Sequence, residues 1–310
     1  MSDLEPIELI AFPGAPNLPI FAAQKQGWFE SEGIRLALST TPSSVFQAEN
    51  LASGKFQIAG TAFDNVVAYR EGEGAKILPG AEEFFAFMGA TQVELAVIVQ
   101  PDIHSHHDLE GKSLALDALT TGFAFLLYEM LARAGLSRED YKVAAVGATP
   151  QRWESVRDGT HAGTLTIEPF TSIAQAQGFR LLDSSTRLFD AYQGGSFAAR
   201  RSWAKANPEA LKGFIRAYLK GLGWVRNPAN REAATALLLE RMPEIKPPVA
   251  GAVMSSLLSE KSGLTPEARM LMDGVARVLE LRTRYVPRDK PLTDPSRYID
   301  LTYYDQAVRS

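Results

Sequence analysis

A strand–loop–helix stretch between residues 111 and 135 offers the clearest place in the sequence for binding a charged group. Ser113–Leu116 is a short apolar run, typical of a buried strand, and apolar residues recur every three or four positions from 123 to 134, which predicts a helix with one buried face. The loop between strand and helix contains Thr120, Thr121 and Gly122. Backbone N–H groups at such a helix N-terminus can hold an anion. The alternative is an ordinary helix start that the threonine hydroxyls cap.

Polar residues also follow three strands that are predicted in the first part of the chain. These strands are expected at 7–12, 34–40 and 56–59, and the carboxyl ends of parallel strands meet at one edge of a sheet. The polar or turn-forming residues that follow them are Pro16, Asn17, Ser43, Ser44, Thr61 and Asp64. Each is also a common cap or turn residue, so only their convergence on one cleft favours a ligand site.

Glu168 has two interpretations. It follows a predicted strand at 163–167 and precedes Pro169, so its backbone is expected to be extended. Its carboxylate could accept hydrogen bonds from a ligand amine or amidine, or it could stabilise the start of the next helix. Asp64 has the same two interpretations, with the helix cap favoured. Because no arginine lies in the loops that follow the predicted strands at 113–116, 142–146 and 163–167, these two acids favour a mixed polar or zwitterionic ligand.

Aromatic side chains could form the walls of a site for a planar ligand. The candidates are Phe12, Phe85, Phe123 and Tyr192. Aromatic residues at such positions are more often part of the core, so both interpretations stay open.

The composition excludes several classes of function. The 310 residues carry a formal net charge of -4, with 45% hydrophobic and 22% charged residues, which is typical of a globular chain large enough for two domains. Nucleic acid is not an expected partner, because no Lys/Arg cluster alternates with aromatic residues. The lack of cysteine excludes disulfides, thiolate metal sites and cysteine nucleophiles. No apolar run approaches the length of a membrane span, and no signal peptide is expected in the N-terminus as written.

Catalytic and metal-binding motifs are not found in the sequence. It shows no nucleophile with a supporting base and no glycine-rich phosphate loop. His104, His106 and His107 lie together in a polar loop, which we interpret as solvated, because His161 is the only other histidine. We therefore expect neither a metal nor a cofactor.

The predicted elements alternate between strands and helices, as in parallel sheets flanked by helices. Further strands are expected at 75–78, 94–99, 142–146 and 179–182. The strand at 94–99 marks the expected passage into a second domain, from which the chain returns through 189–198. The remainder is expected to be helical, with Asn-Pro-Glu at 207–209 and Thr-Pro-Glu at 265–267 as helix starts.

Several segments share their order and spacing with a known protein family. They read LPIFAAQKQGWFESEGI at 18–34, LASGKFQIA at 51–59, DLEGKS at 108–113, EPF at 168–170 and YID at 298–300. On these residues the chain resembles the nitrate/sulfonate/taurine-type substrate-binding proteins of ABC importers. The resemblance extends over nearly the whole chain.

The resemblance implies an α/β fold of the type II periplasmic-binding-protein class. In this fold, two α/β lobes are joined by two crossover strands and a ligand binds in the cleft between them. Lobe one would comprise residues 1–95 and 196–310, and lobe two residues 96–195. The expected ligand-binding residues are then Pro16, Asn17, Ser43, Ser44, Thr61, Asp64, Thr120, Thr121, Gly122, Glu168 and Tyr192.

The function that this resemblance implies is capture of a small polar organic molecule, of the sulfonate, carboxylate or aminopyrimidine class, and its delivery to an ABC permease and ATPase. Such a protein would be periplasmic if a signal peptide has been removed, and cytoplasmic if Met1 is the native start. One alternative is a cytosolic decarboxylase- or synthase-like enzyme of the same fold that acts on an aromatic or heterocyclic acid or a pyrimidine, with Glu168, Asp64 or His161 as acid–base groups. The superfamily includes a thiamine-pyrimidine synthase and an aromatic sulfinate desulfinase, but the lack of cysteine departs from both. A metabolite sensor is a further alternative.

Overall fold

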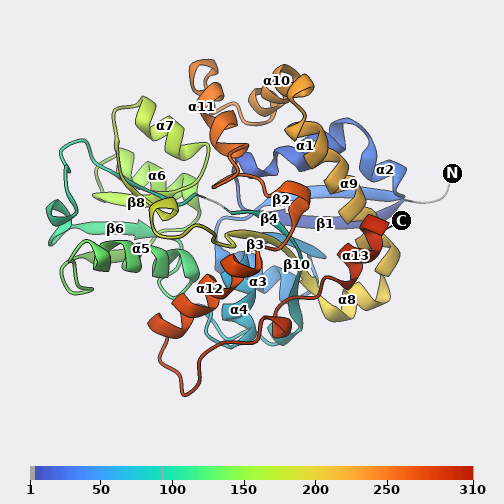
Figure 1. Cartoon of the computed structure of the whole chain (residues 1–310), viewed down its shortest axis with the longest axis horizontal. Helices are drawn as coiled ribbons and strands as arrows, with labels where there is room; N and C mark the ends of the chain where they lie inside the picture. Colours follow the sequence, from blue (N-terminus) through green and yellow to red (C-terminus); the bar gives the residue numbers. More distant parts are fainter. Residues whose placement is uncertain (1–3, 93, 310) are drawn as a thin grey trace.

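The residues that the structure describes form two five-stranded sheets, each covered by helices (Figure 1). The computed structural model describes residues 4–92 and 94–309. In the first sheet the strand order is β2-β1-β3-β10-β4. Its strands are β1 (Glu5–Ala11), β2 (Ile34–Thr40), β3 (Ile58–Ala62), β4 (Phe84–Thr91) and β10 (Gly195–Arg200).

The second sheet has the order β7-β6-β8-β5-β9. Its strands are β5 (Ala96–Val99), β6 (Ser113–Leu116), β7 (Lys142–Ala145), β8 (Gly163–Thr166) and β9 (Arg180–Ser184). Together with the first sheet, this arrangement confirms the expected α/β class.

The sheets are mixed, whereas the sequence predicted parallel ones. β1 runs parallel to β2 and β3, and β6 runs parallel to β7 and β8. However, β10 is antiparallel to both β3 and β4, and β5 is antiparallel to both β8 and β9. β5 and β10 directly follow the two passages of the chain between the sheets, so each enters its sheet without a preceding crossover helix.

One predicted strand was wrong. Residues 75–78 form no strand, and the fourth strand of the chain is β4, at 84–91. All but one of the β4 residues are buried, because the strand lies at a sheet edge that helices and a C-terminal segment cover. Such a continuous apolar run is typical of a strand that is buried on both faces.

The helices cover both faces of the sheets, with α5, α6 and α7 around the second sheet and α1, α2, α8 and α9 around the first (Figure 1). Those before residue 200 are α1 (Leu18–Lys25), α2 (Trp28–Ser31), α3 (Ser44–Ala52), α4 (Phe63–Arg70), α5 (Gly122–Arg133), α6 (Thr149–Arg157) and α7 (Phe170–Ala176). Those after it are α8 (Arg201–Ala206), α9 (Pro208–Arg226), α10 (Arg231–Arg241), α11 (Pro247–Leu257), α12 (Met272–Tyr285) and α13 (Thr302–Arg309).

The two predicted helix starts after residue 200 had different outcomes. Asn207 and Pro208 begin α9, as expected, and the buried stripe of this helix packs against α1. The Thr-Pro-Glu segment at 265–267 does not begin α12. It forms a single short turn in which Glu267 has a left-handed backbone with φ of 54°, and this conformation stops the helix before it can extend.

The C-terminal part of the chain contacts the elements around both sheets. α11 packs against α7, whereas α12 packs against α4 on one side and α5 on the other. We keep the proposed division into lobe one (1–95 with 196–310) and lobe two (96–195) as names for the two halves. Within residues 4–92 and 94–309, no helix is both long enough and apolar enough to cross a membrane.

Candidate functional site

A cavity of about 100 Å³ lies between the two proposed lobes. Its walls come from the carboxyl ends of β1, β3, β6 and β8 and from the amino end of β10. Five predicted site residues line it, namely Pro16, Asn17, Thr61, Thr121 and Gly122. Strand ends in α/β sheets commonly form ligand sites, because the loops that follow them converge there.

Aromatic and aliphatic side chains make up much of the cavity wall. They include Phe12, Leu116, Phe123, Ile167 and Phe197. Two of the four predicted aromatic residues, Phe12 and Phe123, are therefore in place. Phe85 instead packs in the core of lobe one near Phe87, and Tyr192 is buried and stacked on Phe189, so neither lines the cavity.

Arg152 is a charged cavity residue that the sequence reasoning missed. That reasoning considered arginines in loops, whereas Arg152 lies inside α6. The helix buries four of its residues, Thr149, Arg152, Trp153 and Val156, which follow the i, i+3, i+4, i+7 spacing of a helix face. This periodicity was the available signal, because it places an arginine on the buried face.

The guanidinium group of Arg152 lacks partners for much of its hydrogen-bonding capacity. The residue is 2% exposed, and its Nη2 donates to the hydroxyl of Thr149 over 2.8 Å. Its Nε and Nη1 are buried and donate to no atom of the described residues. Burial lowers the pKa of Arg152 to about 10, and the charge of Asp117 acts in the opposite direction.

Asp117 faces the same cavity and connects the lobes. It follows β6 in lobe two, and its carboxylate oxygens accept the backbone N–H of Ser44 in lobe one over 3.1 and 3.3 Å. Ser44 is the first residue of α3, so Asp117 binds the positive end of that helix. Ser43 caps the same helix by accepting the N–H of Phe46. Neither Ser43 nor Ser44 lines the cavity.

The N-terminus of α5 is occupied by a carboxylate of the protein itself. The N–H of Gly122 donates to Oδ2 of Asp64 over 2.5 Å, whereas the hydroxyl of Thr121 caps nothing within the described part of the helix. A Cβ atom on Gly122 would lie 2.5 Å from the Cβ of Asp64, so only glycine allows this approach. The predicted threonine cap is wrong, and the predicted place for an anion is partly taken by Asp64.

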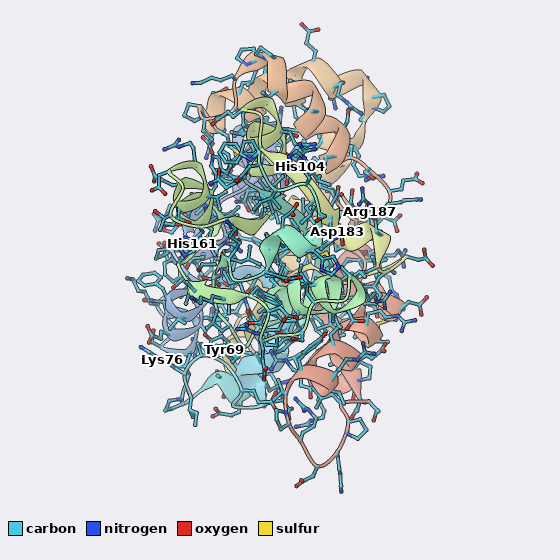
Figure 2. All side chains as sticks on the ribbon, turned by 90° about the vertical axis from the view of Figure 1, so that its left-hand side faces the viewer. Tyr69, Lys76, His104, His161, Asp183 and Arg187 are labelled. Atoms are coloured by element: carbon cyan, nitrogen blue, oxygen red, sulfur yellow. The ribbon has the colours of Figure 1, made fainter. Side chains whose placement is uncertain are left out.

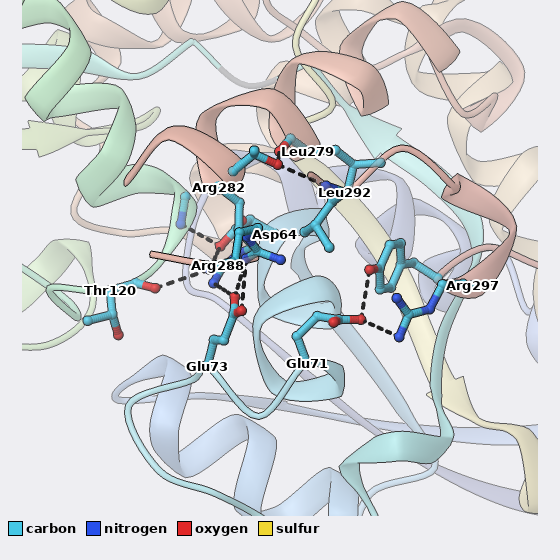
Figure 3. A network of polar contacts seen from close by, with 12 residues as sticks. Asp64, Glu71, Glu73, Thr120, Leu279, Arg282, Arg288, Leu292 and Arg297 are labelled. Atoms are coloured by element: carbon cyan, nitrogen blue, oxygen red, sulfur yellow. Dashed lines mark hydrogen bonds and ion pairs between the residues drawn. The ribbon is translucent and has the colours of Figure 1, made fainter. Parts of the chain in front are cut away.

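Asp64 belongs to a buried ion-pair network rather than to the cavity wall (Figure 3). Its two carboxylate oxygens accept Nε and Nη2 of Arg282 over 2.8 and 2.6 Å. Arg282 lies on α12, is 0% exposed, and also donates to Glu73 and to the backbone carbonyl of Thr120 in lobe two. The side chain of Thr120 itself is exposed and lies outside the cavity.

A second network joins α5 to α12. Glu129 of α5 is 4% exposed and accepts hydrogen bonds from Arg284, Tyr285 and Arg133. Burial acts to raise the pKa of Glu129, but these hydrogen bonds outweigh it, so the pKa lies below its usual value. Helix α12 is thus held by buried or half-buried charges to both lobes.

Glu168 lies beside the main cavity in a smaller one of about 20 Å³. Its carboxylate accepts the hydroxyl and the N–H of Ser172 in α7, which supports the interpretation as a helix-start acid. Glu94 and Ser256 line the same small cavity. Burial raises the pKa of Glu168, and the neighbouring Glu94 adds to this effect, whereas the Ser172 hydrogen bonds oppose it.

The histidines do not come together as metal ligands. His106 contacts Asp183 and His107 contacts Glu110, while His161 lies apart from His104 in Figure 2. Among the residues that the structure describes, no group of three or more histidine, aspartate or glutamate side chains could hold a metal ion.

The sequence matches one known protein family over much of its length. The family model described as "NMT1/THI5 like" matches residues 16–231, which is more than half of the chain. The chain belongs to the NMT1/THI5-like family. Curated protein sequences gave no match.

Solved structures share the fold of this NMT1/THI5-like protein. The alkanesulfonate-binding protein SsuA from Xanthomonas axonopodis pv. citri, bound to MOPS, superposes with a TM-score of 0.71 at 16% identity and 91% coverage of both chains. The periplasmic nitrate-binding protein NrtA from Synechocystis PCC 6803 gives 0.79 at 13% identity, covering 99% of this chain and 89% of that one. A DszB mutant in complex with biphenyl-2-sulfinic acid gives 0.63 at 12% identity, covering 97% and 99%. At such identities the likeness concerns the fold, and it confirms the periplasmic-binding-protein class.

Proposed function

We propose that this protein is a solute-binding protein that captures a small polar organic molecule in the cavity between its lobes and delivers it to an ABC importer. The observation that carries the proposal is the cavity itself, because residues from both lobes enclose it and its polar groups converge from several strand ends. The family membership and the shared fold with SsuA and NrtA, which are named as binding alkanesulfonate and nitrate, support the same role.

The proposed mechanism is closure of the two lobes around the ligand. A ligand that contacts both lobes stabilises the closed arrangement over an open one, because only the closed form offers all of the contacts at once. Thr61 and Asn65 would bind from lobe one, and Thr121 and Thr149 from lobe two. No covalent step is needed for this function.

A thermal-shift screen against sulfonates, aromatic carboxylates, aminopyrimidines, amino acids and nitrate tests the proposal. A ligand at 100 times its Kd adds about 2.7 kcal/mol to the stability, which raises the Tm visibly. Recovery of the bound compound unchanged supports a binding protein, whereas its consumption would show an enzyme instead. Loss of uptake of the same labelled compound in a deletion strain tests the delivery step.

Two neighbouring threonines provide a matched pair of variants for locating the site. The side chain of Thr121 is buried in the cavity wall, whereas that of Thr120 is exposed outside it. Thr121→Trp should fill the cavity and abolish binding of any compound found in the screen, whereas Thr120→Trp should leave it unchanged. Equal affinities of the two variants would contradict the proposed binding site.

A further inference from the structure

On the basis of the proposed function, we infer that the ligand carries two groups of opposite character: an anionic group that binds to Arg152, and an ammonium or other N–H group that faces Asp117. This assigns a class of ligand, the small zwitterion, to a pair of side chains in the cavity wall.

Arg152 requires an anion that the described protein does not supply. Buried arginines in proteins are almost always paired, because an isolated buried charge is very unfavourable. Arg152 is 2% exposed and lines the cavity, yet no carboxylate oxygen of the described residues lies within 4 Å of its guanidinium group. Its Nε and Nη1 hydrogens therefore remain available, and a planar carboxylate or a sulfonate accepts hydrogen bonds from such donors.

Asp117 distinguishes a zwitterion from a simple anion. Its carboxylate lines the same cavity, and it is the acidic group whose charge acts on Arg152. Its two carboxylate oxygens share the single N–H of Ser44. Each oxygen therefore keeps lone pairs that can accept a hydrogen bond from a ligand in the cavity. A bare anion bound to Arg152 would add a second negative charge near Asp117, whereas an ammonium group on the same ligand would compensate it.

The remaining wall limits the body of the ligand. It is formed by Phe12, Leu116, Phe123 and Phe197 together with small residues, and the cavity measures about 100 Å³. A short aliphatic chain or a single ring between the two polar groups fits such a surface, because apolar contacts need no further hydrogen-bonding partners.

Matched compounds that differ in one group test this inference. Calorimetry on the full chain would compare 3-aminopropanoate with propanoate and propylamine, and 3-aminobenzoate with benzoate and aniline. The same sets with sulfonate in place of carboxylate would show which anion is preferred. We expect at least one aminated acid to bind about tenfold or more tightly than each of its two counterparts with a single charge. This is the gain in affinity that one hydrogen bond to a charged group commonly gives.

Two variants then assign the groups to residues. Arg152→Met should lower the affinity for the aminated acid by about tenfold or more. Arg157→Met is the matched control, because Arg157 lies on the same helix but is exposed and paired with Glu154. Asp117→Asn should reduce the preference for the aminated acid over the simple acid. Without ligand, the Tm of Arg152→Met should equal or exceed that of the original protein, because an unpaired buried charge has been removed. A large fall in Tm would show that Arg152 is structural and would overturn the inference.

The failure of this inference can be distinguished from that of the proposed function. If a neutral compound or a simple anion from the thermal-shift screen binds and no aminated acid binds better, the inference is overturned and the solute-binding role remains. If no compound of either set binds, both are overturned. If simple acids bind as tightly as aminated ones, Asp117 has no role in recognition and the zwitterion assignment falls.

Discussion

Two buried arginines of this protein have opposite surroundings. Arg282 lies between α4 and α5, and its guanidinium group donates hydrogen bonds to Asp64, Glu73 and the carbonyl of Thr120. Arg152 is almost equally buried but donates only to Thr149 among the described residues. A paired buried charge contributes to holding elements together, whereas the unpaired charge in the cavity wall is the one that we propose binds the ligand. Removing the partners of Arg282 should therefore reduce stability, whereas removing Arg152 should reduce binding.

Asp64→Ala should have the largest effect on stability. It leaves Arg282 buried without its main partner, and breaking a buried pair in this way destabilises proteins by about 3–5 kcal/mol. Chemical denaturation at neutral pH would measure this loss. Glu240→Ala is the control, because Glu240 forms an exposed pair with Lys25 and such exposed pairs contribute little to stability. Equal losses in the two variants would show that the Arg282 network is not important for stability.

Gly122→Ala should have the next largest effect. The added methyl group would collide with Asp64 across the lobe interface, and overpacking of this kind costs about 1–3 kcal/mol. Gly223→Ala in α9 is the matched control, since nothing lies within 4 Å of its added Cβ. There, the higher helix propensity of alanine should stabilise the protein by about 0.5–1 kcal/mol. A stabilising effect at both positions would contradict the close contact between α4 and α5.

Glu129→Gln should destabilise the protein in a pH-dependent manner. The pKa of Glu129 is lower in the folded protein than its ordinary value of 4.5, so its contribution is fully present above about pH 4.5 and is lost as the pH falls through the folded pKa. We expect a loss of about 1–2 kcal/mol at pH 7, because hydrogen bonds to a charged group are removed. The difference between the two proteins should shrink in acid. A difference that is constant from pH 7 to pH 3 would argue against the charge of Glu129 as its cause.

Glu168→Gln should have the smallest effect and the opposite sign. The pKa of Glu168 is raised in the folded protein, so its ionised form destabilises the fold once the pH exceeds the unfolded value near 4.5. The variant should therefore be equally stable or up to about 1 kcal/mol more stable at pH 7, and this advantage should vanish below about pH 4.5. Thermal unfolding across this pH range would measure it. A loss of stability at pH 7 would show that the Ser172 hydrogen bonds outweigh burial.

Local patterns predicted some elements of the chain better than others. The strand at 34–40 and the one at 113–116 have their predicted bounds, because their apolar residues alternate or run together between clear turn signals. The Thr-Pro-Glu segment at 265–267 was wrongly predicted as the start of a helix, because the same residue pattern can also form a single short turn. Helix starts are local, but the continuation of a helix depends on how its later residues pack against the rest of the molecule.

The candidate site was predictable in part. Pro16, Asn17, Thr61, Thr121 and Gly122 line the cavity, and each was singled out because it follows a predicted strand. Asp64, Ser44 and Glu168 were chosen on the same ground, but their polar groups bind α12, Asp117 and α7 instead. A carboxylate near a strand end has several possible partners, and sequence position alone does not choose among them.

The sequence by itself determined the α/β class, the order of most elements and the strand ends at which a site could form, because periodicity, caps and turns are local properties of the chain. Only the tertiary structure decided which polar groups are already satisfied. Arg282 lies 218 residues from Asp64 in the chain and forms an ion pair with it, whereas Arg152 lies on a buried helix face and forms no ion pair with an acid of the described residues. Whether a buried charge is paired within the protein or can pair with a ligand depends on the distances between segments that are remote in sequence. These distances are set only when the two lobes have packed.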